Sequence, residues 1–513
     1  MRTRLVLILA AVLVVLAGNL AVPVLDEELW LSLGRALDAG RPYDWARAMP
    51  PWGQNPGDSY LFAHPPGFLW WVWAACKAGL EVTGTRWLAG LPAALIFVFA
   101  AGKLASRAGR PLLAGALWLS APVVVMGLQR GLMPDALAAA LATAAVACWL
   151  EDRRGWLVAG GLLLGAAVCV KYPAGLALLG ILAHGVSAGR LRRCWPFFAA
   201  MFAVFVGLEG WLWLEYGRIH LLTVLESAPQ IARGPLNSRA LGVLARLGFV
   251  ACPLLILSGR SWILGFLLGG AALAWGWPEG LAGGQSLALL GYAVAGGALF
   301  AFMLQCSMRR PMLRCSISLP ERRLYAVWAL AVVFGVVLGH NYASPRYLLA
   351  AALPLSLLLV ASAPARLGWV LVAAQAALST AMGLAEAGQV RAAEAVADAV
   401  VMAFPGGGSF SGEWTWRYAL ERPAPGAGPW RWTDGPAPAG GVLVAPAQSA
   451  PQPVPDNATR VASFTAGEAP GSGGLILLDA AAGVGFYAET LGPLPLGWSA
   501  GPLEEARVYV VAP

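Results

Sequence analysis

The chain opens with MRTRLVLILAAVLVVLAGNLAVPVLDEELW (residues 1–30), in which an apolar run lies between two arginines and three consecutive acids. The run has about 20 residues, the length that an α-helix needs to cross the hydrocarbon core of a bilayer. It is longer than the apolar part of a typical secretory signal, and further apolar runs follow it. We therefore interpret it as an uncleaved membrane helix, with Arg2 and Arg4 in the cytoplasm and Asp26 on the opposite side.

The composition of the whole chain indicates a polytopic helical membrane protein. Of its 513 residues, 58% are hydrophobic and 12% are charged, and the mean hydropathy is +0.66. Soluble domains carry about 25% charged residues. The net charge of +8 comes mostly from arginines in short clusters between apolar runs, a pattern of cytoplasmic loops and not of a nucleic-acid-binding surface. The seven cysteines form no Cys-x-x-Cys pair and predict neither a disulfide framework nor a zinc cluster.

Basic clusters predict the topology, because arginine and lysine collect in cytoplasmic loops. The clusters that we assign to the cytoplasm are Lys103, Arg107 and Arg110; Arg153 and Arg154; Arg190, Arg192 and Arg193; Arg260; Arg309, Arg310, Arg314, Arg322 and Arg323; and Arg366. Between successive clusters there is room for two crossings. The result is about thirteen helices that begin inside and end outside.

The first outer loop is expected to run from about residue 26 to 86. It contains PPGFLWWVWAACKAGL (65–80), which is too short to span and whose tryptophans suit a helix in the outer interface. It also contains an amphipathic helix over 27–38, which Gly40 and Pro42 end. The apolar face of that helix consists of Leu29, Trp30, Leu33 and Leu37.

The composition changes after residue 387, where glycine and proline become frequent and short strand-like runs appear, such as GVLVAP (441–446) and ARVYVVAP (506–513). We predict an all-α membrane domain over residues 1–387. A small soluble α/β domain over residues 388–513 is expected on the extracytoplasmic side.

Ionisable residues recur at the predicted outer ends of the helices. Asp26 and Glu27 begin the first outer loop, and Asp135 opens the fourth helix; each is also a suitable helix cap. The outer-face basic residues, which the positive-inside rule does not explain, are Arg86, Arg130, Lys171, Arg218, Arg233, Arg239 and Arg346. Snorkelling of Lys171 and contact of Arg346 with lipid headgroups are the simpler explanations for those two residues.

Together these residues suggest chemistry at the outer membrane surface. Two carboxylates on one face would divide a proton-accepting task from an orienting one, and an arginine fork matches phosphate oxygens. The chain has no nucleotide-binding motif, so an activated donor would be carried by a lipid. His64 alone is a loop histidine, and the four histidines with no HExxH motif do not define a metal site.

Six segments occur in an order that resembles the lipid-dependent glycosyltransferase C superfamily. The resemblance covers roughly residues 5–365 and is to the branch that holds protein O-mannosyltransferases and the aminoarabinose transferases of lipid A. The segments are LDEELWLSLGRALDAGRPY (25–43), HPPGFLWWVWA (64–74), TRWLAGLPAAL (85–95), LMPDALAAAL (132–141), KYPAGLALL (171–179) and SPRYLLAA (344–351).

The resemblance implies a glycosyltransferase C fold with juxtamembrane helices in the first outer loop, and a polyprenyl-phosphate sugar as donor. It implies that Asp26 is the catalytic acid of the first outer loop, with Glu27 beside it, and that Asp135 is the second outer-loop acid. The substrate-binding positions that it implies are His64, Arg86, Lys171, Arg346 and Tyr347. Some family members hold zinc, but no clear ligand set is present here, and a divalent ion is left open.

The function expected from these residues is inverting transfer of a sugar, hexosyl or pentosyl, by a multi-pass protein of the bacterial cytoplasmic membrane. The acceptor is open between a protein, lipid A and an envelope glycan. The alternative is a non-catalytic transporter or flippase of lipid-linked sugars, which would show broken helices near the bilayer midplane.

Overall fold

The structure is a computed structural model that describes residues 2–18, 27–37, 64–227, 235–251, 259–276, 283–308, 316–339, 344–411, 415–421, 426–433, 440–447, 454–467, 474–479, 484–487, 492–499 and 501–512. Asp26, the predicted catalytic acid, lies outside these ranges, as do the predicted helix-ending residues Gly40 and Pro42.

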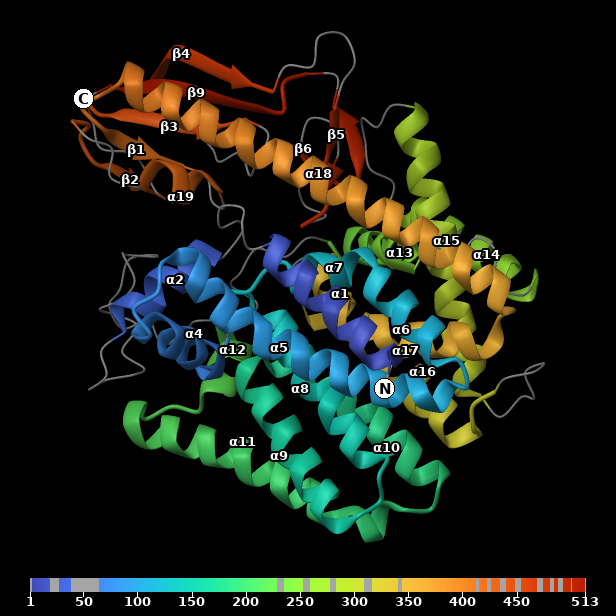
Figure 1. The fold of residues 1–513 in the computed structure, drawn as a ribbon. Coiled ribbons are helices and arrows are strands. Elements are labelled where there is room, and N and C mark those ends of the chain that lie inside the picture. The colour runs from blue at the N-terminus through green and yellow to red at the C-terminus, as the bar shows by residue number, and fades with distance from the viewer. Residues whose placement is uncertain are drawn as a thin grey trace.

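Helices dominate the first 403 residues (Figure 1). They are α1 (Arg2–Gly18), α2 (Glu27–Ala36), α4 (Gly67–Lys77), α5 (Val82–Ala105), α6 (Pro111–Ser120), α7 (Pro122–Leu128), α8 (Pro134–Trp149), α9 (Arg154–Val170), α10 (Ala177–Ser187), α11 (Trp195–Tyr216), α12 (His220–Ser227), α13 (Leu236–Ala251), α14 (Gly259–Gly276), α15 (Gly283–Ser307), α16 (Leu319–Gly339), α17 (Leu349–Ser362) and α18 (Ala365–Ala403). Short 3₁₀ turns are η2 (Ser106–Ala108), η3 (Tyr172–Leu176), η4 (Leu191–Cys194) and η5 (Pro345–Leu348).

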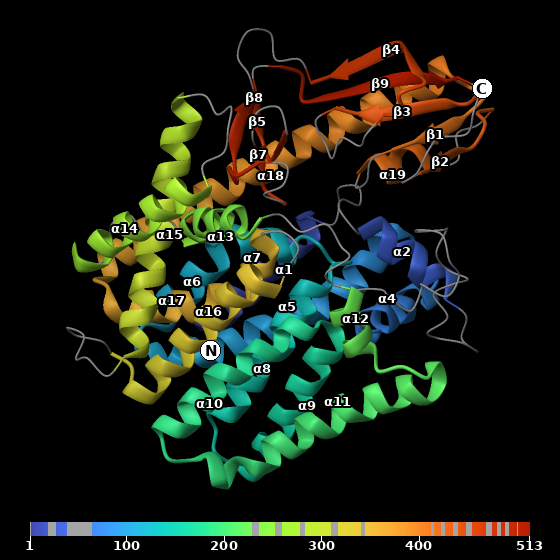
Figure 2. The same cartoon turned by 180° about the vertical axis from the view of Figure 1, so that it is seen from behind.

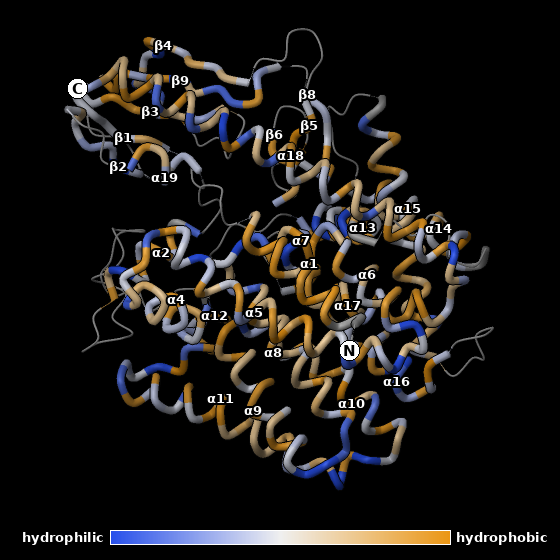
Figure 3. Tube along the Cα trace, in the orientation of Figure 1, coloured by the Kyte–Doolittle hydropathy of each residue, from blue (hydrophilic) through white to orange (hydrophobic). Residues whose placement is uncertain are grey.

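The described residues contain 6 helices that are long and apolar enough to cross a membrane, or up to 7 if α6 and α7 form one bent span. Further apolar helices of 10–17 residues lie among them, and apolar residues prevail along most of the helical region (Figure 3). The multi-pass helical domain is therefore confirmed, while the count of about thirteen helices stays a prediction. The 71° bend between α6 and α7 falls at Ala121, whose extended backbone is the conformation that a following proline favours.

Basic clusters that are far apart in the sequence meet at one end of the helical domain. There they pair with the acids of the α8–α9 connection and with the first turn of α16. The contacts are Lys103–Glu151 at 3.2 Å, Arg107–Glu321 at 3.0 Å, Arg190–Asp152 at 2.6 Å and Arg323–Ser187 at 2.9 Å. Because α8 ends at this side and begins at Pro134, Asp135 lies at the opposite end of the domain.

The described part of the predicted first outer loop contains two short helices that pack on each other. The residues predicted to share one face of α2, namely Leu29, Trp30, Leu33 and Leu37, are all buried. Trp30 meets Phe68 of α4 edge-on, with ring centroids 4.9 Å apart. Gly34 allows the close approach, since a Cβ there would lie 2.8 Å from Val72. With 11 residues, α4 is too short to span a bilayer.

The C-terminal region contains a five-stranded sheet in the order β2-β1-β3-β9-β4. β1 pairs in parallel with β2 and β3, whereas β9 pairs antiparallel with β3 and β4. The strands are β1 (Gly408–Phe410), β2 (Trp430–Trp432), β3 (Val442–Pro446), β4 (Ala458–Ala466), β5 (Gly474–Ile476), β6 (Leu478–Asp479), β7 (Val484–Gly485), β8 (Gly497–Ser499) and β9 (Glu504–Val511), with the helix α19 (Thr415–Glu421) between β1 and β2. The predicted small α/β region is confirmed.

α18 connects the two regions without a break. Its 39 residues run through the predicted boundary at 387/388 and on along the five-stranded sheet, where Val396 and Val400 are buried with residues of β1, β3 and β9 (Figures 1 and 2). The domain boundary stays a prediction. β5 to β8 lie nearer to the membrane helices, and Ile476 and Val484 are buried in the same cluster as Leu241 of α13.

Candidate active site

The first of two buried ion pairs near the start of α8 joins α2 to α5. Arg86 contacts Glu27 through two nitrogens, at 2.8 and 3.3 Å, and neither side chain has any exposure. The backbone N–H of Leu132 donates to the same carboxylate at 3.2 Å. Both oxygens of Glu27 are thus engaged, and the residue ties the start of α2 to the segment before α8.

The second buried ion pair joins two broken helix ends. Asp135 lies in the first turn of α8, after Pro134. Lys171 ends α9 in an extended conformation, and Pro173 in the next turn prevents the helix from continuing. The Lys171 ammonium lies 2.6 Å from Asp135, and the two side chains are 6% and 7% exposed. Two charges that would be costly alone are therefore held together.

Arg346 and Tyr347 complete this cluster from η5. The Lys171 ammonium lies 4.7 Å from the centre of the Tyr347 ring, and the Arg346 guanidinium lies 5.1 Å from it. These distances are within the range of cation–π contacts. Asp135, Lys171, Arg346 and Tyr347 line one cavity of about 40 Å³, between α8, η3, α16 and α17.

His64 lies at the edge of the site. Its ring stacks on Trp30 of α2, with centroids 5.9 Å apart and planes inclined by 25°. The structure thus gathers the described predicted residues at one end of the helical domain, as two buried ion pairs with aromatic neighbours.

A third ionic cluster escaped the sequence analysis. Arg130, in the segment between α7 and α8, pairs with Glu386 of α18, and the Tyr487 hydroxyl donates to the same carboxylate. All three residues are less than 9% exposed. Arg130 stands out in the sequence as an outer-face cation, and Glu386 is an isolated acid in the apolar stretch GLAEAG. Nothing in the sequence predicts that Arg130 and Glu386 pair, because they are far apart in the chain and meet only when α18 packs against the other helices.

A fourth cluster lies beside Lys171 and was also missed. The hydroxyl of Tyr172 is 2.7 Å from Glu209 and 2.6 Å from Nδ1 of His220. The backbone N–H of Leu221 donates to the other oxygen of Glu209 at 3.3 Å. The sequence signal for it was Glu209 within the apolar run of α11, since an acid inside a membrane helix normally has a specific partner.

Two residues that line a second cavity each have a buried polar atom without a partner among the described residues. These atoms are Nε of Arg130, a donor, and Oδ2 of Asp135, an acceptor. Each such atom costs about 1–3 kcal/mol when it lacks a partner. Both residues line a cavity of about 30 Å³ together with Arg346, Phe486 and Tyr487. A donor and an acceptor beside cationic side chains fit a ligand that carries both hydroxyl groups and negative charge.

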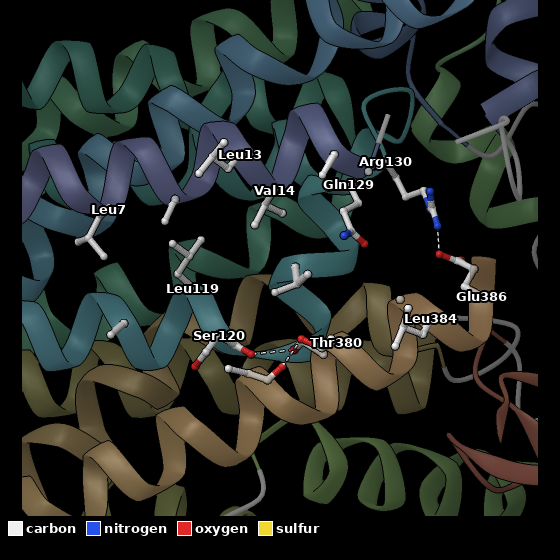
Figure 4. Close-up of a pocket in the computed structure, with 18 of the residues that line it drawn as sticks. Leu7, Leu13, Val14, Leu119, Ser120, Gln129, Arg130, Thr380, Leu384 and Glu386 are labelled. Carbon is white, nitrogen blue, oxygen red and sulfur yellow. Dashed lines mark hydrogen bonds and ion pairs between the residues drawn. The ribbon is translucent and has the colours of Figure 1, made fainter. Parts of the chain in front are cut away.

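A long apolar groove of about 800 Å³ lies between α1 and α18 (Figure 4). Its walls come from α1, α6, α7 and α18, and side chains such as Leu7, Leu13 and Leu119 line it. The groove ends at the Arg130–Glu386 pair. Arg130 lines both the groove and the small cavity, so its side chain lies between the two spaces.

Among the described residues, no group of three or more His, Cys, Asp or Glu side chains has the arrangement of a metal site.

The comparisons with known proteins give a likeness of fold. No family model matches the chain, and no curated protein matches it. The chain is similar to the crystal structure of ArnT from Cupriavidus metallidurans bound to undecaprenyl phosphate, with a TM-score of 0.42 and 16% identity over 82% of this chain and 85% of that chain. For the apo state of ArnT the TM-score is 0.37, again with 16% identity, over 83% and 85% of the two chains.

ArnT is a lipid A aminoarabinose transferase with the glycosyltransferase C fold. It belongs to the branch that the sequence motifs resemble. The likeness concerns the course of the chain alone.

Proposed function

We propose that this protein is a glycosyltransferase that moves a sugar from a polyprenyl-phosphate donor to an acceptor at the outer face of the cytoplasmic membrane. The observation that carries the proposal is the convergence of Asp135, Lys171 and Arg346, from three separate elements, on one cavity. That cavity lies at the end of the helices opposite to the paired basic clusters. By the positive-inside rule, the site and the C-terminal region then face away from the cytoplasm.

Lys171 and Arg346 are proposed to hold the donor phosphate. Charge grows on the phosphate as the bond to the anomeric carbon breaks, and fixed cations in a buried site stabilise that charge. Tyr347 keeps both cations in place through its ring. Arg86 is not assigned to the phosphate in this proposal, because Glu27 neutralises its charge in a fully buried pair.

Asp26 is proposed as the general base that accepts the proton of the acceptor. A single base opposite the leaving phosphate gives direct displacement and inversion, and such assistance is worth about 10²–10⁴-fold. Glu27, the next residue, is held by Arg86 and Leu132, so we assign it the positioning of this part of the chain. Asp135 orients the sugar, because its second oxygen has no partner among the described residues.

The groove between α1, α6, α7 and α18 is proposed to hold the apolar chain of the lipid. Its lining is almost entirely apolar along the length of α1, and it ends at the charged residues. A lipid with one long chain and a phosphate matches this distribution.

The alternative function is a transporter or flippase of lipid-linked sugars. The observation that favours it is the 71° break between α6 and α7, at the wall of the groove, since transporters build their sites from broken helices. The ionisable residues, however, lie at the helix ends and not near the middle of the helices.

The decisive experiment uses membranes that contain the full chain and radiolabelled polyprenyl-phosphate sugars. We expect transfer of label to an acceptor, and a loss of about 10²-fold or more in Asp26→Asn, which retains the fold. Near-normal transfer in Asp26→Asn contradicts the assignment. Movement of labelled lipid across proteoliposomes without transfer supports the transporter instead.

A further inference from the structure

We infer that Arg130 is the first binding residue for the phosphate of a membrane lipid, ahead of Lys171 and Arg346, and that Glu386 occupies the place of that phosphate until the lipid arrives. The inference relies on the proposed function for the identity of that lipid, a polyprenyl phosphate. Arg130, Glu386 and Tyr487 form what we call the latch.

The position of the latch is the first support. Arg130 and Glu386 lie at the end of the apolar groove, and Arg130 and Tyr487 lie on the wall of the small cavity. A lipid whose chain fills the groove brings its headgroup to the latch before it reaches Asp135. The latch is therefore the first charged group that the phosphate meets.

The hydrogen bonding of Arg130 is the second support. Its Nη2 pairs with Glu386, whereas its Nε is buried and has no partner among the described residues. The side chain is only 7% exposed. A guanidinium fork presents parallel N–H groups that match two oxygens of a phosphate. A phosphate would satisfy Nε as well as Nη2, which the Glu386 carboxylate does not do here.

The size of the cavity is the third support. Its volume is about 30 Å³, far smaller than the groove of about 800 Å³. Tyr487 closes the wall and is fixed by its hydrogen bond to Glu386. When the phosphate replaces Glu386 on Arg130, the two negative groups repel each other. The carboxylate then moves away from Arg130, and the Tyr487 side chain that donates to it moves with it. Binding of the phosphate would thus open the cavity for the sugar.

Replacement of Glu386 by the phosphate would also involve the C-terminal region in substrate binding. Phe486 and Tyr487 come from the segment after β7, and they are buried against the membrane helices. A structural role of the latch, which would only fasten α18 and this segment to the helical domain, is the competing interpretation. The two interpretations predict opposite effects when the charge of Glu386 is removed.

The test measures binding of undecaprenyl phosphate to the purified full chain by titration, without sugar or acceptor. In Glu386→Gln the competitor loses its charge, and we expect binding at least about fivefold tighter, the lower end of typical coupling between sites. Arg130→Gln should weaken binding by a similar factor. Tyr487→Phe removes one contact of Glu386 and should tighten binding to a smaller extent, and it serves if Glu386→Gln does not fold.

The controls separate charge exchange from loss of stability. Glu151→Gln breaks ion pairs at the opposite end of the helices and should leave binding unchanged. Neutral undecaprenol should bind equally to all variants, and inorganic phosphate should not compete measurably, because it lacks the chain. Unchanged or weaker binding in Glu386→Gln and Tyr487→Phe overturns the inference, as does an equal gain for undecaprenol.

The binding of undecaprenyl phosphate can be measured whether or not the protein transfers a sugar. Asp26→Asn should bind the lipid normally. If transfer is absent in every variant while Glu386→Gln still binds more tightly, the latch stands and the proposed enzyme does not. If transfer proceeds and Glu386→Gln binds as the unaltered protein does, the latch alone is wrong.

Discussion

Buried charges at the site are compatible with folding because each one has a partner of opposite sign. Glu27 is held by Arg86, and Asp135 by Lys171, with less than a tenth of any side chain exposed. An isolated charge in such a place would cost several kcal/mol, whereas a pair recovers much of that cost through its mutual attraction. At this scale the stray acids and bases of the sequence were informative, since a charge near a membrane helix requires a reason.

A single and a double variant distinguish the contribution of the Asp135–Lys171 pair to stability from its contribution to sugar transfer. Lys171→Met leaves the Asp135 carboxylate buried without its closest cation, so we expect a loss of up to about 3–5 kcal/mol in the free energy of unfolding, as well as loss of transfer. The double variant Asp135→Asn/Lys171→Met removes both charges and should recover much of the stability but none of the transfer.

Thermal unfolding in detergent, followed by tryptophan fluorescence, together with the transfer assay measures both effects. A double variant as unstable as Lys171→Met would show that the pair is not the source of the loss. Transfer by Lys171→Met at the normal rate would remove Lys171 from the phosphate site.

Helices of the membrane domain approach one another where glycine replaces a side chain. In α9, Gly161 and Gly165 face α11, with the spacing of a small-xxx-small contact. A Cβ at Gly161 would overlap the backbone carbonyl of Phe197, and one at Gly165 would lie 2.7 Å from Val204. The contact between α9 and α11 therefore depends on the absence of these atoms.

Gly161→Ala should destabilise the protein by about 1–3 kcal/mol, because the extra methyl meets backbone that cannot move aside easily. Gly207→Ala in α11 is the matched control, since nothing lies within 4 Å of a Cβ at that position. Thermal unfolding of the two variants under the same conditions compares them. Equal unfolding temperatures would show that α9 and α11 do not pack as closely as described.

The whole molecule joins its two regions through a buried arginine on α13. Arg246 is fully buried and donates to three backbone carbonyls, those of Gly485 in β7 and of Phe486 and Gly492 after it. Gln389 of α18 holds the neighbouring strands through the backbone of Leu477 and Leu478. The segment that carries Phe486 and Tyr487 is thereby fixed to the membrane helices.

Arg246→Met should release this segment, because several buried carbonyls lose their donor. We expect faster cleavage near residues 485–492 in limited proteolysis of the full chain in membranes, and slower transfer. Arg190→Met, which breaks an arginine contact at the other end of the helices, is the control and should leave that cleavage unchanged. Equal cleavage in all three proteins would mean that other contacts anchor the segment.

The sequence by itself predicted the helical class of the first region and the strands of the second, and it singled out the ionisable residues of the candidate site. A bilayer of nearly constant thickness requires apolar helices of nearly constant length, so α5, α11 and α16 could be located without a structure. Glycine, proline and alternating residues marked the C-terminal strands for a similar reason. The cost of charge near lipid singled out Asp135, Lys171 and Arg346 as residues of one face.

Only the tertiary structure decided which charges meet. Glu27 could have remained exposed beside Asp26, and the sequence holds no sign that Glu386 pairs with Arg130 or that Tyr487 joins them. The strength of an ion pair depends on distance and burial, and both are set by the packing of helices that are remote in the chain. For the same reason, the groove at the latch and the place of Phe486 in the cavity wall became visible only when α1, α7 and α18 were assembled.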